Sequence, residues 1–179
     1  MPQEVELFAG TVRDNVTLFD PVPSDASVDQ ALRAVGLGAL ADAGLARVLG
    51  PAGAGLSAGE AQLVSLARVW LRQPDLIVLD EATARVDPAT EARLAAAVDR
   101  LLEGRTALVI AHRLSTLESV DDVLVFAGGQ VVEFGPRAQL ADDPTSRFHR
   151  LLTLSRGNGD DVDALADGIG DDRPEGVLV

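Results

Sequence analysis

Two short apolar runs separated by a helical pattern constrain the fold of this 179-residue chain most. Residues 76–79 read Leu-Ile-Val-Leu and residues 106–110 read Thr-Ala-Leu-Val-Ile. Continuous apolar runs of this length are typical of parallel strands buried on both faces. Between them, Asp87 and Pro88 provide an N-cap and a first-turn residue for a helix that Gly104 closes. The pattern therefore predicts an α/β fold in which a helix crosses between two parallel strands.

Further elements are expected on both sides of these strands. Two pairs with capping-box spacing begin at Ser27 and Ser57. They predict one helix that ends near Gly36 and a longer helix that stops before Pro74. Beyond the second strand, the pattern predicts a short helix over 115–120, a hairpin of strands 123–126 and 130–134 around two glycines, and a terminal helix over 146–154.

Acidic charge is concentrated at the C-terminus. Residues 157–179 contain seven acidic residues and one arginine, which account for −6 of the formal net charge of −13. A segment with this charge and so few apolar residues cannot form a core of its own. We therefore expect a folded domain over residues 1–156 and a disordered acidic tail over 157–179.

The composition excludes several kinds of chemistry. All 15 basic residues are arginines, and the chain contains neither lysine nor cysteine. Disulfides, thiolate metal sites, lysine Schiff bases and a phosphate-binding Gly-Lys-Ser/Thr loop are thereby excluded within this sequence. The acidic pI of about 4.4 argues against a nucleic-acid partner, which requires basic patches. The apolar runs are too short for a membrane helix, so we expect the isolated chain to be soluble.

Polar side chains follow both core strands at the point where each strand ends. Asp80 and Glu81 follow the first strand, and His112 follows the second. Ligands of parallel α/β sheets bind at this edge. One carboxylate can hold Mg²⁺, the next can activate a water for attack on a phosphoryl group, and the histidine can donate to a phosphate. An acidic pair is also common as a helix cap, and a lone histidine is often structural. The order of the other motifs therefore has to decide between a catalytic and a structural interpretation.

In that order, five segments resemble the motifs of ATP-binding cassette (ABC) ATPases, especially the nucleotide-binding domains of ABC exporters. They are the signature motif at 56–62, Walker B with its catalytic glutamate at 76–81, the D-loop Asp87, the switch His112, and the Q-loop Gln3 followed by an exporter-type segment at 7–15. The resemblance covers about residues 2–154. It implies a P-loop NTPase fold with a helical subdomain over about 11–75, and a parallel-sheet catalytic portion with a C-terminal hairpin over 76–156.

The resemblance also implies ATP and Mg²⁺ as ligands and a role for each matching residue. Asp80 would hold Mg²⁺ through water, Glu81 would be the general base, and His112 would sense the γ-phosphate. Gln3 would link the metal and the attacking water to the membrane domain. The nucleotide of a second cassette would be contacted by Ser57, Ala58, Gly59 and Glu60, with Ser57 and Gly59 at its γ-phosphate, and Asp87 would couple the two sites.

The sequence departs from the family pattern at several places, of which two bear most on function. In the signature motif, Ala58 replaces a glycine and Glu60 stands where glutamine is commoner. The family's adenine-stacking aromatic and Walker A loop precede the Q-loop, and here only Met1 and Pro2 precede Gln3. We therefore expect a partial ABC ATPase domain that is inactive in isolation, with Met1 lying inside a longer exporter gene or marking a gene fragment. The implied partners are an ABC transmembrane domain and a second nucleotide-binding domain, at the cytoplasmic face of the cell membrane.

Two other interpretations stay open. In the first, the chain would be a non-catalytic module that lends its signature face to a complete cassette, or a gene remnant. Intact Asp80, Glu81 and His112 weigh against long degeneration. An SMC-like chromosome ATPase shares two motifs, but it would carry long heptad arms and would lack the exporter segment. An ATPase assay on the chain, alone and mixed with a complete cassette, separates the catalytic and module interpretations.

Overall fold

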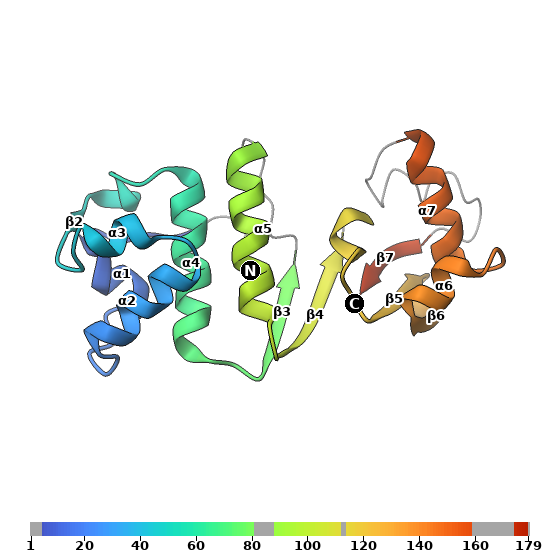
Figure 1. Ribbon diagram of the computed structural model, residues 1–179, viewed down its shortest axis with the longest axis horizontal. Helices are drawn as coiled ribbons and strands as arrows, with labels where there is room; N and C mark the ends of the chain where they lie inside the picture. The colour runs from blue at the N-terminus through green and yellow to red at the C-terminus, as the bar shows by residue number, and fades with distance from the viewer. Residues whose placement is uncertain (1–4, 81–87, 112–113, 159–173, 179) are drawn as a thin grey trace. The chain divides into compact units, whose positions relative to one another are not determined.

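The computed structural model describes residues 5–80, 88–111, 114–158 and 174–178. The chain divides into two compact units (Figure 1). The helical unit comprises residues 2–77 and 82–106, and the sheet unit comprises residues 78–81 and 107–179.

Helices α1 to α5 make up most of the described helical unit. Their bounds are Val12–Thr17 (α1), Asp25–Ala34 (α2), Gly38–Asp42 (α3), Ala58–Arg72 (α4) and Pro88–Leu102 (α5), and two short antiparallel strands, Gly10–Thr11 (β1) and Val48–Leu49 (β2), accompany them. Helix α4 packs against α1, α2 and α5. The core consists of aliphatic side chains on the facing sides, among them the fully buried Val12, Val16, Val28, Leu32, Leu63 and Leu66.

The capping residues explain where two of these helices begin. The prediction for α4 is confirmed, because Ser57 is its N-cap and the helix ends at Arg72, before Pro74. The prediction for α2 is wrong at its start, since the N-cap is Ser24 and the helix already includes Ser27. The Oγ of Ser24 accepts a hydrogen bond from the Ser27 backbone N–H at 3.2 Å, which satisfies one of the free donors of the first turn.

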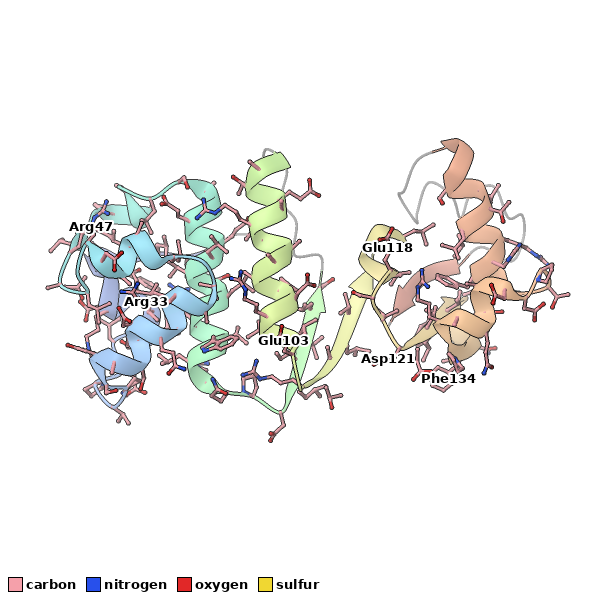
Figure 2. The ribbon with its side chains drawn as sticks, viewed as in Figure 1. Arg33, Arg47, Glu103, Glu118, Asp121 and Phe134 are labelled. Atoms are coloured by element: carbon pink, nitrogen blue, oxygen red, sulfur yellow. The ribbon has the colours of Figure 1, made fainter. Side chains whose placement is uncertain are left out.

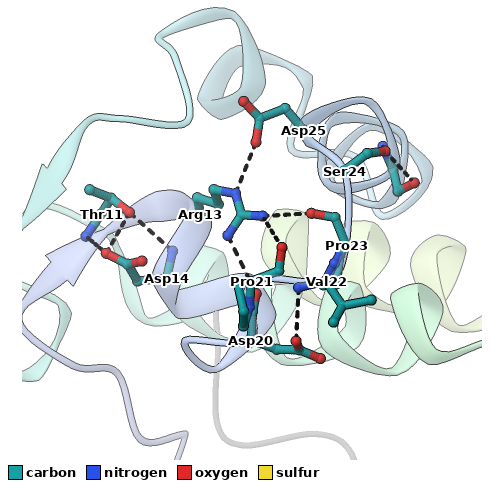
Figure 3. A network of polar contacts seen from close by, with 10 residues as sticks. Thr11, Arg13, Asp14, Asp20, Pro21, Val22, Pro23, Ser24 and Asp25 are labelled. Carbon is teal, nitrogen blue, oxygen red and sulfur yellow. Dashed lines mark hydrogen bonds and ion pairs between the residues drawn. The ribbon is translucent and has the colours of Figure 1, made fainter.

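Arg13 fastens α1 to the loop that leads into α2 (Figure 3). Its Nε donates to Asp25 Oδ1 at 2.9 Å, and its Nη atoms donate to the carbonyl oxygens of Asp20, Pro21 and Pro23. Thr11 and Asp14 form a capping box at the start of the same helix. A guanidinium presents its donors in a fixed fork, so one side chain holds the whole loop in place.

The sheet unit combines a five-stranded sheet with short helices. The strand order is β3-β4-β7-β5-β6. The bounds are Leu76–Asp80 (β3), Thr106–Ala111 (β4), Asp122–Ala127 (β5), Gln130–Pro136 (β6) and Pro174–Leu178 (β7), with a 3-10 helix at Leu114–Leu117 and helices Arg137–Asp142 (α6) and Arg147–Asn158 (α7). The predicted hairpin is confirmed, because β5 and β6 pair antiparallel around Gly128 and Gly129, whose φ values are +58° and +70°.

Residues from four elements, β4, the 3-10 helix, β5 and α7, form the core of the sheet unit. Leu117, Val123, Val125, Phe148 and Leu151 are fully buried in one cluster. Glu133 on β6 holds α7 over the sheet: its carboxylate accepts hydrogen bonds from the backbone N–H groups of Arg147 and Phe148 and from the Ser146 hydroxyl, at 2.9 to 3.0 Å. A carboxylate at a helix N-terminus also interacts favourably with the helix dipole.

The expected burial of β3 on both faces is wrong. Ile77 and Leu79 are 4% exposed, whereas Leu76 and Val78 are 57% and 50% exposed. Successive strand residues point to opposite faces, so one face of β3 is packed and the other is open in this chain. The apolar run predicted the strand correctly, but not what covers it.

The C-terminal tail also differs from the prediction of disorder. Helix α7 continues to Asn158, and residues 174–178 form β7, which pairs antiparallel with both β4 and β5. Backbone hydrogen bonds on two sides can order a short segment whose composition favours disorder, and composition alone does not show them. The expectation of disorder is therefore wrong for 174–178, and residues 159–173 and 179 lie outside the described residues.

Candidate functional site

The N-terminus of α4 and the residues before it, here named the signature turn (residues 55–60), form a capped helix start. Ser57 Oγ accepts from the Glu60 backbone N–H at 3.2 Å, and Glu60 Oε2 accepts from the Ser57 N–H at 2.8 Å. Before the cap, Arg47 Nη2 donates to the Gly55 carbonyl oxygen at 3.1 Å; Figure 2 labels Arg47 in the loop that precedes β2. Ser57 and Ala58 are exposed, so the first turn of α4 is held in place and accessible to solvent.

Gly59 differs from its exposed neighbours because it is buried against α5. A Cβ atom at this position would lie 2.2 Å from Cγ2 of Thr90, a distance at which the two carbons would overlap. Gly59 was predicted to lie at the γ-phosphate of a nucleotide held by a second cassette. In this structure it lets two helices of the same unit approach each other.

Of the polar residues predicted to lie at the ends of the two core strands, the structure describes only Asp80. Asp80 is the exposed last residue of β3, in the sheet unit. Glu81, Asp87, His112 and Gln3 lie outside the described residues, and the structure therefore does not test how they are placed. Of the predicted site residues, the structure brings together Ser57, Ala58, Gly59 and Glu60. Among the described residues, no group of three or more histidine or acidic side chains forms a candidate metal site.

Two residues that sequence reasoning missed hold the exporter-type segment against the helices. Asn15 is fully buried; its Nδ2 donates to the carbonyl oxygens of Phe8 and Thr11, and its Oδ1 accepts from the Phe8 N–H at 2.8 Å. Arg68 on α4 donates through Nε to the Asn15 carbonyl at 2.8 Å and through Nη2 to the Glu6 carbonyl at 2.9 Å. Each is a polar residue at a helix position where the periodicity predicts an apolar one. No other feature of the sequence pointed to either residue.

The surroundings of Arg68 are electrostatically unfavourable. Burial lowers the pKa of its guanidinium, and the positive charge of Arg72 lowers that pKa further. The carbonyl oxygens that accept its hydrogen bonds carry no full charge, so they satisfy its donors without neutralising it. The helical unit therefore holds a partly buried positive charge beside a second one.

The groups present suit nucleotide chemistry at two places. A helix N-terminus with exposed small residues suits a phosphate, because its free backbone N–H groups and dipole attract anions. An exposed carboxylate at a strand end suits Mg²⁺, which prefers oxygen ligands. Glu60 opposes a phosphate at the signature turn, because its carboxylate already caps the same turn.

Comparisons with known proteins identify the family of the chain. The sequence matches the ABC transporter family over residues 1–84. It is 40% identical to the ATP-dependent lipid A-core flippase of Neisseria gonorrhoeae over 77% of this chain and 23% of that protein. It is 41% identical to YheH of Bacillus subtilis, a probable multidrug resistance ABC transporter ATP-binding/permease protein, over 87% of this chain and 23% of that protein.

A solved structure shows the same fold. The ATP-bound structure of a bacterial Atm1-family ABC exporter matches 78% of this chain and 25% of its own chain, with a TM-score of 0.64 and 32% sequence identity. The chain thus spans about a quarter of the length of each of these three proteins. No helix within the described residues is long and apolar enough to cross a membrane. The family match, the relatives and the fold together show that the chain belongs to the ABC transporter family, as a relative of the exporter nucleotide-binding domains with their P-loop NTPase fold.

Proposed function

We propose that this chain is an ATP-binding and ATP-hydrolysing part of an ABC exporter that couples hydrolysis to transmembrane transport. The observation that carries the proposal is the signature turn, a helix start that is capped by Ser57 and Glu60 and exposed at Ser57 and Ala58. Such a turn is suited to contact a phosphate presented by another molecule. In the proposal, that phosphate belongs to ATP held by a second nucleotide-binding domain.

Within the signature turn, the proposal gives the residues different parts. Ser57 contacts the γ-phosphate directly, because its side chain is exposed. Gly59 contacts it only after Thr90 has moved away, since Thr90 covers it in this structure. Glu60 weakens the phosphate contact through the negative charge of its carboxylate.

The hydrolytic residues come from the strand ends. Asp80 would hold Mg²⁺ through water, Glu81 would accept a proton from the attacking water, and His112 would donate to the γ-phosphate. Bound Mg²⁺ would supply the positive charge that phosphoryl transfer requires. Gln3 would link this site to the membrane domain, and Asp87 would couple the two ATP sites.

The membrane domain would dock on the helical unit. Phe8, Leu18, Phe19 and Val22, here named the apolar patch, are all exposed, and the rings of Phe8 and Phe19 meet edge to face at 5.9 Å. Large exposed apolar side chains that lie close together are typical of interaction surfaces. This docking would place the chain at the cytoplasmic face of the cell membrane.

These 179 residues include no lysine that could contact the β- and γ-phosphates. The proposal therefore expects little ATP turnover by the chain alone. A complete exporter cassette whose own signature serine is replaced by alanine provides the test. Adding this chain should restore ATP turnover, and adding Ser57→Ala should not.

Two results would change the proposal. Equal restoration by the Ser57→Ala chain would overturn the role of the signature turn. Comparing wild type with Glu81→Gln then separates hydrolysis from binding: a loss of restored turnover supports a hydrolytic role, and unchanged turnover supports a non-catalytic module that lends only its signature face.

A further inference from the structure

Strand β7 lies in the middle of the sheet, although it is the last described element of the chain. It pairs antiparallel with β4 on one side and with β5 on the other, so β4 and β5 run parallel to each other. The two strand edges that face each other across β7 are here named the strand slot. Residues 174–178 fill this slot, and none of them is among the residues assigned to ATP.

Several features of β7 are unfavourable for a central strand. It begins with Pro174, which has no backbone N–H, and it contains Gly176, which weakens the interior of a strand. It pairs with β4 only at Ile110 and Ala111, and its register with β5 shifts near the end of that strand. The hairpin partners β5 and β6, in contrast, pair along the whole of β5. Strands with glycine and irregular register are weakly specified, so β7 is held less firmly than its neighbours hold each other.

The chain enters β7 at the edge of the sheet where a ligand is expected. Ala111, the last residue of β4, is opposite Val177, so residues 174–176 lie beyond the end of β4. Asp80 ends the neighbouring strand β3, whose arrowhead lies at the same edge as that of β4 in Figure 1. Ligands of such sheets bind outside the carboxyl ends of the parallel strands. The start of β7 therefore occupies the edge that the proposed function assigns to Mg²⁺ and ATP.

Glu175 adds a negative charge at this edge. The described strand pairs give it no partner on β4 or β5, because it is the extra residue where the register with β5 shifts. Irregularities of this kind are common next to active sites. Since β7 is two strands away from β3, it lies about 10 Å from the strand that ends at Asp80. An acidic residue at this distance disfavours the binding of a triphosphate.

From these observations we infer that β7 is a detachable inhibitory strand. While it fills the strand slot, it excludes ATP from the carboxyl edge of β3 and β4, and its release admits Mg²⁺ and ATP. The inference rests on the proposed function, which assigns ATP to this edge, and it adds the regulation of that site. A binding-competent state that is only partly populated lowers the apparent affinity in proportion to its population. The affinity of the chain for ATP is therefore set by the fraction of molecules in which β7 is detached.

A disulfide that locks β7 in place tests the inhibitory role on the full chain. Leu124 on β5 pairs with both Leu178 on β7 and Phe134 on β6, and the chain has no cysteine of its own. Opposed residues of antiparallel strands are close enough for a disulfide. Oxidised Leu124→Cys/Leu178→Cys should bind a fluorescent ATP analogue with Mg²⁺ at least about tenfold more weakly than the reduced form. Oxidised Leu124→Cys/Phe134→Cys is the matched control, and its affinity should change by less than about twofold.

A variant that releases β7 should act in the opposite direction. Val177→Pro removes a backbone donor from a central strand, where proline is not tolerated. We expect about fivefold tighter binding of the same ATP analogue, because the detached state becomes more populated.

Hydrogen exchange of the unmodified chain tests detachment without nucleotide. Along β5, successive N–H groups point alternately toward β6 and toward β7. Release of β7 alone should therefore make exchange along residues 122–127 alternate between slow and fast. Release together with the hairpin would make it uniform.

Three outcomes would overturn the inference. Equal affinities of the oxidised and reduced Leu124→Cys/Leu178→Cys variant, or unchanged or weaker binding by Val177→Pro, would overturn the inhibitory role. Uniform exchange along β5 would overturn the detachment. If no form of the chain binds ATP, the proposed function fails and the inhibitory role with it, whereas the exchange pattern still decides whether β7 detaches. The two failures are therefore distinguishable.

Discussion

The signature turn in the helical unit and the end of β3 in the sheet unit hold their candidate site residues in different ways. At the signature turn, hydrogen bonds across three residues fix the backbone, and Gly59 is buried against a neighbouring helix. At the end of β3, Asp80 is exposed, and one face of its strand carries the exposed Leu76 and Val78. The comparison shows that the signature turn is already built by interactions within one unit, whereas the strand is packed on one face alone.

The largest stability effect is expected inside the helical unit, at Asn15. In Asn15→Ala, the N–H and C=O of Phe8 and the C=O of Thr11 lose their partner, and a small cavity opens. We expect the free energy of unfolding to fall by about 3 kcal/mol. Urea denaturation measures it, with Gln30→Ala on the exposed side of α2 as the control. A loss as small as that of the control would mean that the exporter-type segment is not held by Asn15.

Gly59→Ala should have the next largest effect. Its Cβ would overlap Thr90 Cγ2, and we expect a loss of about 2 kcal/mol despite the better helix propensity of alanine. Gly38→Ala is the matched control, because a Cβ there meets only Arg33 Nη1 at 3.7 Å; Figure 2 labels Arg33 on α2. Thr90→Ser removes Cγ2 and should restore most of the loss in the double variant. No restoration would show that Thr90 is not what covers Gly59.

In the sheet unit, the Glu133 side chain caps the start of α7, as the capping box of Ser57 and Glu60 caps the start of α4. Glu133→Ala removes the acceptor of three hydrogen bonds at the start of α7, and we expect a loss of about 1.5 kcal/mol. Hydrogen exchange of the Arg147 and Phe148 amides should accelerate more than that of the α4 amides. Equal acceleration in both helices would contradict the assignment of the two elements to separate units.

The smallest effect is expected on the open face of β3. Val78→Thr keeps the β-branched shape of the side chain at a position that is half exposed, and we expect a change below about 0.5 kcal/mol. Leu79→Thr on the packed face, where the native residue is 4% exposed, should cost several times more. Similar losses at both positions would show that a partner covers the face in solution.

The predictions from sequence succeeded where the signal was local. The Ser57 and Glu60 pair, the apolar run of β3 and the glycine pair of the hairpin each specify structure over a few residues, and all three were confirmed. At α2 the prediction placed the start at Ser27, but the side chain that caps the helix is that of Ser24, three residues earlier.

Non-local interactions could not be predicted. The strand partners of β7 lie 47 to 68 residues away in sequence (Ala127 to Pro174 and Ile110 to Leu178), and nothing in the composition of the tail indicates them. Arg68 was missed for the same reason, since its hydrogen bonds reach 53 and 62 residues back along the chain. The structure of the signature turn was thus predictable because it lies on one helix turn, and the roles of the candidate site residues are proposals.

ATP-dependent association tests the central claim most directly, namely that the signature turn binds a phosphate of ATP held by a second nucleotide-binding domain. Sedimentation velocity would be run on this chain mixed with a complete exporter cassette whose catalytic glutamate is replaced by glutamine. The account predicts a heterodimer with Mg²⁺ and ATP, no heterodimer without nucleotide, and at least about tenfold weaker association for Ser57→Ala. Association that is equal with and without ATP, or unaffected by Ser57→Ala, would contradict it.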